Sequence, residues 1–245
     1  MSSAGNPGPV PGPVPGPVPL PDPPLLIITD RGQAQAPLTE IAEALFRAGV
    51  RWLMLREKDL DPTTRRGLLQ DLVARGAPFG ARVTVNGDLA AAQAAGAVGL
   101  HLPAGNDIGA RLAEARRTLG SGALLGVSAH DPTEALIAAE SGADYVTLSP
   151  VFESASKPGY GPALGPAGLK ALAVRLTIPA VALGGIGVGN VGACLGAGAA
   201  GVAVMGAVMG AADPGAAACK LLAALAAALA AENAAAGVAL GQILR

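Results

Sequence analysis

Short, predominantly apolar runs alternate with segments of helical pattern along most of this chain. Runs of this kind are typical of strands that are buried on both faces. They are LLIITD (25–30), RWLMLRE (51–57), ARVTVNG (81–87), GLHLP (99–103), LLGVSA (124–129), YVTLSP (145–150), PAVALGG (179–185) and GVAVMG (201–206). Each run is followed by a stretch of helical composition, so the pattern predicts eight strand–helix units.

Capping and turn residues separate the predicted units. Two Asp-Pro pairs, at 61–62 and 131–132, combine a favoured N-cap residue with proline at the first helical position. Glycines at 49 and 96 stand where two other helices are expected to end. The expected helices include 38–48, 108–119 and 165–176.

Alternating strands and helices require a parallel sheet with the helices outside it. Eight such units in roughly 210 residues close naturally into a barrel, and no G-x-G-x-x-G motif follows the first strand as a dinucleotide-binding sheet would require. We therefore predict a single TIM (β/α)8 barrel over residues 25–233. Residues 1–24, which contain the run PGPVPGPVPGPVP, are predicted to be a disordered tail, and residues 234–245 a C-terminal tail.

Composition narrows the class of protein. Hydrophobic residues make up 51% of the chain but aromatic residues only 2%, so the core must be aliphatic. The net charge of −1 and the lack of a basic run argue against a nucleic-acid partner. Two cysteines without metal-type spacing fit a reducing, cytoplasmic setting, in which both would be small buried hydrophobes.

The segment Ala216–Ala231 is the longest apolar helical stretch of the chain. It is rich in alanine and carries Lys220, so we interpret it as a helix packed on the surface and expect no membrane span. Such a helix can contact the barrel or a second subunit, so the pattern leaves a homo-oligomer open. The N-terminal tail lacks the charged and apolar regions of a secretory signal.

Most polar candidates lie at the end of a predicted strand or directly after it. TIM barrels carry their chemistry at the carboxyl ends of the strands, so this clustering favours an enzyme. The long loop after the sixth strand contributes Ser154, Ser156 and Lys157, and loops of that length are usually functional or disordered. The other residues at this rim are Arg56, Lys58, Asn86, Asp88, His101, Ser128, His130, Gly184, Gly185, Met205 and Gly206.

Two groups at the rim are suited to anions. Gly184 and Gly185 after the seventh strand, with Met205-Gly206 after the eighth, can present backbone N–H groups to a phosphate. Arg56 and Lys58 supply positive charge for a second anionic group. The alternative for these two cations is a surface ion pair with Glu57 or Asp59.

His130 is the candidate acid/base, because an imidazole side chain titrates near neutral pH and this one follows a strand directly. Ser128 lies two residues before it and is expected to face the same mouth. His101 either faces the mouth or packs inside the barrel, and its position at the end of a strand does not decide between the two.

Several motifs in order resemble the thiamine phosphate synthase / TenI family. The motifs are ITD (28–30), LREKD (55–59), VNGD (85–88), HLP (101–103), GVSAH (126–130), ADYVTLSPVF (143–152), SKPG (156–159) and ALGGI (182–186). The resemblance covers about Leu25 to Ala212. It implies a TIM barrel of thiamine biosynthesis that either joins a pyrimidine diphosphate to a thiazole phosphate or, in the TenI branch, isomerises a thiazole carboxylate phosphate.

The resemblance also implies where the two branches differ. Synthases of the family hold Mg²⁺ with an aspartate after the Asn of strand three and a carboxylate in the loop after strand four. Here Asn86 matches but Gly87 stands at the aspartate position, and Asp88 and Asp107 are each one residue out of register. The family's pyrophosphate loop, Thr-x-Thr-Lys, is conservatively replaced by SASK (154–157).

The lost carboxylate register leads us to predict a TenI-type thiazole tautomerase. In this interpretation His130 and Ser128 are catalytic, no cofactor is needed, and the partner is a small phosphorylated thiazole. The alternative is a thiamine phosphate synthase that uses Mg²⁺ at Asp88 and Asp107. A non-catalytic regulator that binds thiamine phosphates, and another phosphate-binding barrel such as an isomerase of aromatic amino-acid synthesis, are the remaining hypotheses.

Overall fold

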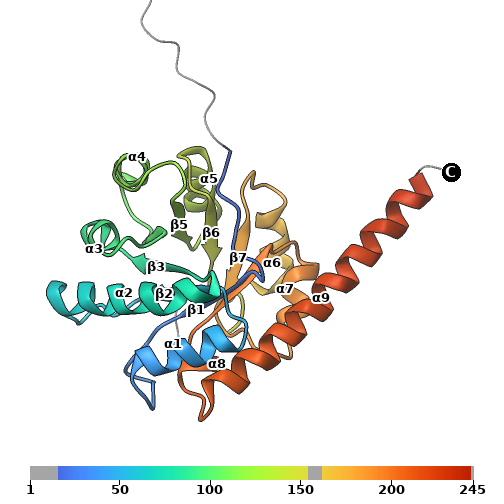
Figure 1. The fold of residues 1–245 in the computed structure, drawn as a ribbon. Coiled ribbons are helices and arrows are strands. Elements are labelled where there is room, and N and C mark those ends of the chain that lie inside the picture. The colour runs from blue at the N-terminus through green and yellow to red at the C-terminus, as the bar shows by residue number, and fades with distance from the viewer. Residues whose placement is uncertain (1–15, 154–161, 244–245) are drawn as a thin grey trace, which may run out of the picture.

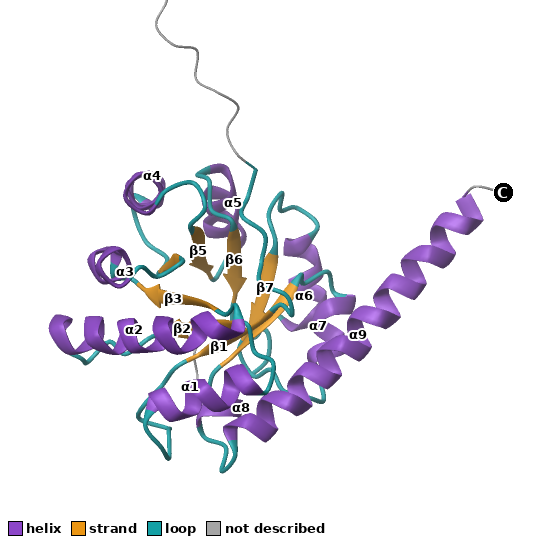
Figure 2. Cartoon of the chain, in the orientation of Figure 1, coloured by secondary structure: helices purple, strands orange, loops and turns teal. Residues whose placement is uncertain are grey.

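A closed barrel of eight parallel strands, in chain order, forms the centre of the molecule (Figures 1 and 2). The computed structural model describes residues 16–153 and 162–243. Every predicted strand is present, and β8 pairs with β1 to close the barrel, so the predicted TIM barrel is confirmed. The strands are β1 (Leu25–Ile28), β2 (Trp52–Leu55), β3 (Arg82–Asn86), β4 (Gly99–Leu102), β5 (Leu124–Ala129), β6 (Tyr145–Leu148), β7 (Ala180–Leu183) and β8 (Gly201–Val204).

Helices surround the barrel, and two of them begin at the predicted caps. The Asp61 carboxylate accepts from the N–H groups of Thr63 and Thr64, and Asp131 accepts from the N–H of Glu134. The described helices are α1 (Leu38–Arg47), α2 (Pro62–Gly76), the 3-10 turn η1 (Ala77–Phe79), α3 (Leu89–Ala95), α4 (Ile108–Leu119), α5 (Pro132–Glu140), α6 (Gly165–Ala173), α7 (Val191–Gly196), α8 (Gly206–Met209) and α9 (Pro214–Ile243).

Strand side chains alternate between two separate cores. The larger core lies between the strands and the helices, and Phe46 is the one aromatic residue among its described buried members. The smaller core fills the barrel interior and consists of Leu26, Ile28, Trp52, Met54, Leu124, Tyr145, Val181 and Ala203. Because side chains on a strand alternate between faces, residues two positions apart on one strand share the interior face, and the last of each such row lies nearest the mouth of the barrel.

Tyr145 lies inside the barrel because its neighbour on β5 is a glycine. Gly126 and Tyr145 are register partners, and a Cβ added at Gly126 would lie 2.0 Å from Cζ of the Tyr145 ring. The ring also meets Trp52 edge to face, with centroids 4.9 Å apart. The absent side chain at 126 therefore makes room for the only tyrosine in the described inner core.

Replacing Gly126 with alanine is expected to lower the free energy of unfolding by about 1–3 kcal/mol, because overpacking forces the tyrosine ring from its site. Urea denaturation measures this change. The matched control is Gly122→Ala, where an added Cβ meets nothing within 4 Å and no appreciable change is expected. Equal stability of the two variants would contradict the packing described here.

The segment just before β1 is not a free tail, so the prediction for residues 1–24 is wrong for residues 16–24. The Val18 N–H donates to Asp144 Oδ1 at 2.8 Å, and Arg82 Nη1 donates to the carbonyl of Pro19 at 3.2 Å. Val18 and Leu20 also pack against the inner core. This segment therefore covers the N-terminal end of the barrel, opposite the mouth. Residues 1–15 lie outside the described part of the chain.

The C-terminal helix is longer than predicted. Residues 234–243, predicted to be tail, continue α9 to Ile243. Ala218, Leu221 and Leu225 are buried against the barrel side, where α9 contacts α1, α7 and α8, whereas the second half of the helix leaves the barrel (Figure 1). By length and composition alone, Pro214–Ala235 could cross a membrane, and 17% of its most apolar window is buried.

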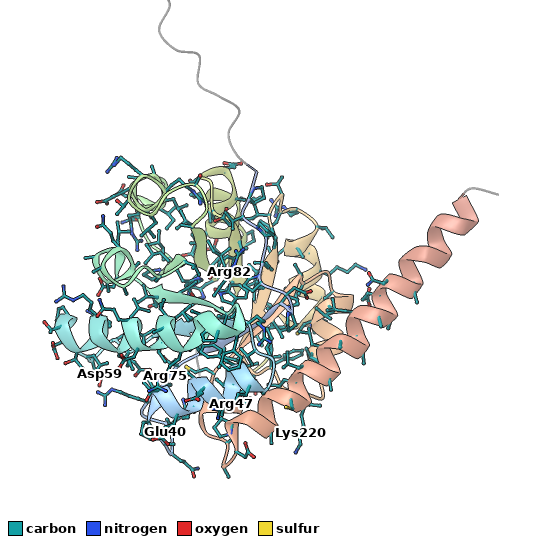
Figure 3. The ribbon with its side chains drawn as sticks, viewed as in Figure 1. Glu40, Arg47, Asp59, Arg75, Arg82 and Lys220 are labelled. Atoms are coloured by element: carbon teal, nitrogen blue, oxygen red, sulfur yellow. The ribbon has the colours of Figure 1, made fainter. Side chains whose placement is uncertain are left out.

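The outer surface carries charged side chains between neighbouring helices (Figure 3). Glu43 of α1 pairs with Arg47 of the same helix at 2.5 Å and with Arg75 of α2 at 3.0 Å. Of the two cysteines, Cys194 is buried as expected but Cys219 is exposed, and both are free thiols.

Candidate active site

The inward-facing rows of strand residues end in the predicted site residues. Arg56 follows Met54 on β2, Asn86 follows Thr84 on β3, and Ser128 follows Gly126 on β5. Asn86 pairs in register with His101, and His101 pairs with Gly126. Parallel strands in register thus bring groups that are far apart in the sequence to one end of the barrel.

Arg56 and Lys58 form no ion pair with any residue in the described ranges, so the predicted alternative for these two cations is not what the structure shows. Both carboxylates that were candidates for pairing with them are taken by Arg31. Its backbone N–H lies 3.2 Å from each oxygen of the buried Glu57, and its guanidinium pairs with Asp59. Arg56 is half-buried at the mouth, and its N–H donates to Thr29 Oγ1 at 2.9 Å.

The sequence alone does not identify Arg31 as a residue of the candidate site. The one feature that points to it is its place directly after the first predicted strand, next to Asp30. Its contacts are with Glu57 and Asp59, which follow the neighbouring strand, and only the barrel register brings these groups together. Arg31 thus pairs with the two carboxylates that are adjacent in sequence to Arg56 and Lys58.

His101 is buried inside the barrel, which resolves the alternative left open by the sequence. It is 3% exposed, with Nδ1 3.0 Å from the Tyr145 hydroxyl and Nε2 2.9 Å from Ser128 Oγ. Burial, with a smaller effect from the positive charge of Arg56, lowers the pKa of His101 to about 3. Burial also raises the pKa of the Tyr145 phenol above its usual range, with Asp144 adding to the shift. The imidazole is therefore neutral and the phenol protonated at physiological pH.

His130 is exposed and follows β5 directly, which is the position that the sequence predicts for it. Its Nδ1 lies 3.0 Å from the carbonyl oxygen of Ser149 and 3.3 Å from Ser149 Oγ. The backbone N–H of His130 donates to Glu134 Oε2 at 2.7 Å, while the Glu134 N–H donates to Asp131. This reciprocal capping arrangement fixes the turn that carries the imidazole. A catalytic role for His130 stays a prediction.

Gly184 and Gly185 have a packing function that the sequence did not suggest. Both have positive φ, +101° and +63°. A Cβ at these two positions would lie 2.9 Å from Pro150 Cα and 2.3 Å from the Glu153 carbonyl oxygen, respectively. The Phe152 N–H donates to the Gly184 carbonyl at 3.0 Å, so the chain after β6 crosses directly over this turn. Phosphate binding here stays a prediction.

The end of β8 faces a residue from the loop after β1. A Cβ at Gly206 would lie 3.0 Å from Gln33 Oε1, and Gln33 is held by its amide nitrogen, which donates to Asp30 Oδ2 at 2.6 Å. Met205 is half-buried against the inner core. Phosphate binding by Met205 and Gly206 is untested, and Ser154, Ser156 and Lys157 lie outside the described residues.

Asp88 and Asp107 differ in what surrounds them. Asp88 Oδ1 accepts from the Ala91 N–H at 2.9 Å, and its Oδ2 lies 2.9 Å from Arg65 Nε. Asp107 is an exposed N-cap residue of α4 with φ of 58°, and its side chain makes no capping hydrogen bond. Among residues 16–153 and 162–243, no group of three or more His, Cys, Asp or Glu side chains could hold a metal ion.

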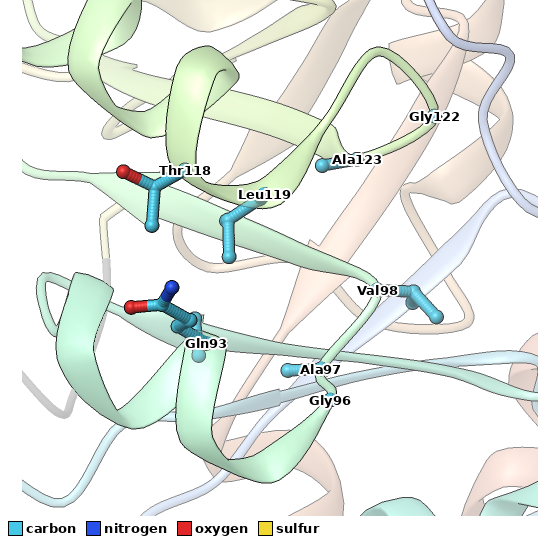
Figure 4. Close-up of a pocket in the computed structure, with 9 residues that line it drawn as sticks. Gln93, Gly96, Ala97, Val98, Thr118, Leu119, Gly122 and Ala123 are labelled. Carbon is cyan, nitrogen blue, oxygen red and sulfur yellow. The ribbon is translucent and has the colours of Figure 1, made fainter.

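A shallow cavity of about 340 Å³ lies between the C-terminal ends of α3 and α4 (Figure 4). Gln93 and Thr118 are the only residues of its lining with polar side chains. It lies beside Val98, which precedes β4, and therefore at the end of the barrel opposite the mouth. No charged side chain lines it, so we assign it no chemistry.

Comparison with known proteins agrees with this architecture. The family model described as "Thiamine monophosphate synthase" matches residues 25–208, which is most of the chain. The chain belongs to the thiamine monophosphate synthase family. The resemblance inferred from the motifs is thereby confirmed, and the hypothesis of an unrelated phosphate-binding barrel is set aside.

Relatives of this thiamine monophosphate synthase family member carry consistent names. A "Putative thiamine-phosphate synthase" from Geobacter sulfurreducens is 42% identical over 182 residues, which is 74% of this chain and 84% of the relative. A thiamine-phosphate synthase from Salinispora tropica is 38% identical over 204 residues, 82% of this chain and 96% of the relative. The structure of thiamine phosphate pyrophosphorylase from Pyrococcus furiosus matches with a TM-score of 0.73 at 28% identity, over 84% of this chain and 96% of that one.

Proposed function

We propose that this protein is a thiamine-phosphate synthase, which joins hydroxymethylpyrimidine diphosphate to a thiazole phosphate and releases pyrophosphate. The observation that carries the choice of branch is the naming of the relatives, which reach 42% identity over 74% of the chain. These names favour the synthase over the tautomerase that the sequence led us to expect.

The charges at the mouth support this proposal. In the synthase reaction the bond between the pyrimidine methylene carbon and the pyrophosphate oxygen breaks, and its electron pair leaves with pyrophosphate. The thiazole nitrogen then donates its lone pair to that carbon. Arg56 and Lys58, which no described carboxylate neutralises, are suited to stabilise the negative charge that develops on the leaving group.

The carboxylates implied by the family do not form a ready-made Mg²⁺ site in the described residues. Asp88 Oδ1 caps the N-terminus of α3, and its Oδ2 pairs with Arg65. A metal ion would have to displace Arg65 from this carboxylate. Mg²⁺ can be held by one or two carboxylates together with substrate phosphates, but those carboxylates must be available. We therefore derive no step through the metal.

The pairing of Asp88 with Arg65 also favours a second candidate, the TenI-type tautomerase. A tautomerase moves one proton and needs a phosphate anchor with a positioned acid and base, but no metal carboxylates. Ser128, His130 and the glycines after β7 supply groups of those types. The Arg65–Asp88 pair is the specific feature that keeps this candidate in view.

Two assays on the purified full chain separate the candidates. The first follows pyrophosphate release from hydroxymethylpyrimidine diphosphate and thiazole phosphate with MgCl2 present. The second follows aromatisation of the unsaturated thiazole carboxylate phosphate without added metal. Release in the first supports the synthase. Turnover in the second alone overturns it in favour of the tautomerase, and ligand binding without turnover in either assay supports the regulator.

Replacing Asp88 with asparagine tests the assignment of this carboxylate. Asparagine is as good an N-cap as aspartate, so if Asp88 serves only α3 and Arg65, activity should stay close to that of the unsubstituted protein. Loss of a metal ligand would instead lower kcat/KM by at least the roughly 10- to 100-fold that loss of a group supporting a ligand costs, and would raise the Mg²⁺ requirement. Asp61→Asn, at the N-cap of α2, is the matched control.

A further inference from the structure

Three side chains from three strands form a hydrogen-bonded chain from the barrel interior to the mouth. The Tyr145 hydroxyl of β6 meets Nδ1 of His101 of β4 at 3.0 Å, and Nε2 of His101 meets Ser128 Oγ of β5 at 2.9 Å. Tyr145 is fully buried, His101 is 3% exposed, and Ser128 is half-buried at the rim. Gly126 clears the space for the phenol ring.

The direction of these hydrogen bonds follows from counting donors and acceptors. A neutral imidazole carries one N–H, so His101 either accepts from Tyr145 and donates to Ser128, or the reverse. In the described part of the chain the Tyr145 hydroxyl has no hydrogen-bond partner other than His101. If it accepted from Nδ1–H, its own proton would be buried without an acceptor, which is costly.

The phenol therefore donates to Nδ1, and the Nε2–H of His101 donates to Ser128 Oγ. A serine hydroxyl has a single proton and two lone pairs. Since its oxygen accepts from His101, its proton is not used inside the barrel and can point into the mouth. The reverse arrangement would draw that proton inward and leave Ser128 to act only as an acceptor.

We propose that Tyr145 and His101 are positioning residues that fix the Ser128 hydroxyl as a hydrogen-bond donor to the bound substrate. The substrate atom it meets is then an acceptor, such as a ring nitrogen or an oxygen without a proton. The proposal rests on the site proposed above, but it does not depend on which of the two reactions that site performs.

The tautomer of His101 can be measured by NMR, without an activity assay. The chain has only two histidines, so long-range 1H–15N correlation spectra of protein labelled with 15N-histidine contain two imidazoles. A His130→Asn variant assigns them. We expect His101 to show the Nε2–H tautomer without titrating between about pH 5 and 8. An Nδ1–H tautomer, or titration in that range, would overturn the proposal even if the protein proved to be an active synthase.

Tyr145→Phe removes the phenol hydroxyl while preserving the ring that packs on Trp52. We expect the Nδ1–H tautomer to become populated and kcat/KM to fall about 10-fold, the effect of one misdirected hydrogen bond. In a Ser128→Ala background the same change should cost nothing further, since the group being positioned is gone. Additive losses would refute a positioning role.

Thr147→Val is the matched control for loss of a buried hydroxyl from β6. Thr147 is fully buried in the same strand as Tyr145, and its Oγ1 has no hydrogen-bond partner among the described residues. The His101 spectrum and the activity should both be unchanged in this variant. If Tyr145→Phe fails to fold, the tautomer of His101 in the unsubstituted protein still tests the proposal by itself.

Discussion

Replacing Arg56 with methionine should lower kcat/KM for pyrophosphate release by about 100- to 1,000-fold, the usual cost of removing one group that stabilises a developing anion. Arg56 lies half-buried at the mouth with no ionic partner in the described residues, so its charge is available to the substrate. Methionine keeps most of the apolar stem, which limits any loss of packing. Steady-state kinetics at saturating Mg²⁺ measures the effect.

Arg66→Met is the control for the change in net charge, because Arg66 is exposed on α2 and makes no ion pair with a described residue. Its activity should match that of the unsubstituted protein. Arg31→Met offers a sharper comparison. It frees Glu57 and Asp59 to pair with Arg56 and Lys58, so we expect a partial loss of activity that decreases at high salt. Full activity of Arg56→Met would remove the basis for assigning the leaving group to this side of the mouth.

Replacing Asp144 with alanine should lower the free energy of unfolding by about 3–5 kcal/mol. This carboxylate is 2% exposed and accepts from the N–H groups of Val18 at 2.8 Å and Leu125 at 2.6 Å. It also pairs with Arg116 at 2.8 Å. Its removal leaves a buried N–H without an acceptor and a guanidinium without its counter-ion.

Urea denaturation measures this loss, and hydrogen exchange at Val18 tests whether the segment before β1 detaches with it. Asp71→Ala, an exposed carboxylate on α2, is the control and should change stability by no more than about 0.5 kcal/mol. Asp144→Asn retains an acceptor and should fall between the two. A loss for Asp144→Ala no larger than the control would mean that this network contributes little to the fold.

The barrel was predictable because its strands are short apolar runs whose period differs from that of the helices around them. The cap residues Asp61 and Asp131 also act locally, through the N–H groups two or three residues further along. The ends of the chain were not predictable in this way. Val18 is held by Asp144, 126 positions away, and no local pattern records that contact.

The same distinction between local contacts and contacts across strands applies to the candidate site. The position of Ser128, like those of Arg56 and Asn86, could be predicted from its place near the end of a predicted strand alone. The arginine that holds Glu57 and Asp59, and the link from Tyr145 through His101, both cross between strands and depend on register. The branch of the family stays a proposal, because the carboxylate register in the sequence points to the tautomerase whereas the names of the relatives favour the synthase.

The sequence by itself therefore determined the eight strand–helix units, the closed parallel barrel and the rim at which polar groups gather, since alternation and capping act over a few residues. Only the tertiary structure decided which charges at that rim are neutralised, where His101 points, and what the glycines after β7 accommodate. These outcomes depend on distances between strands that are remote in sequence, and barrel closure alone sets those distances.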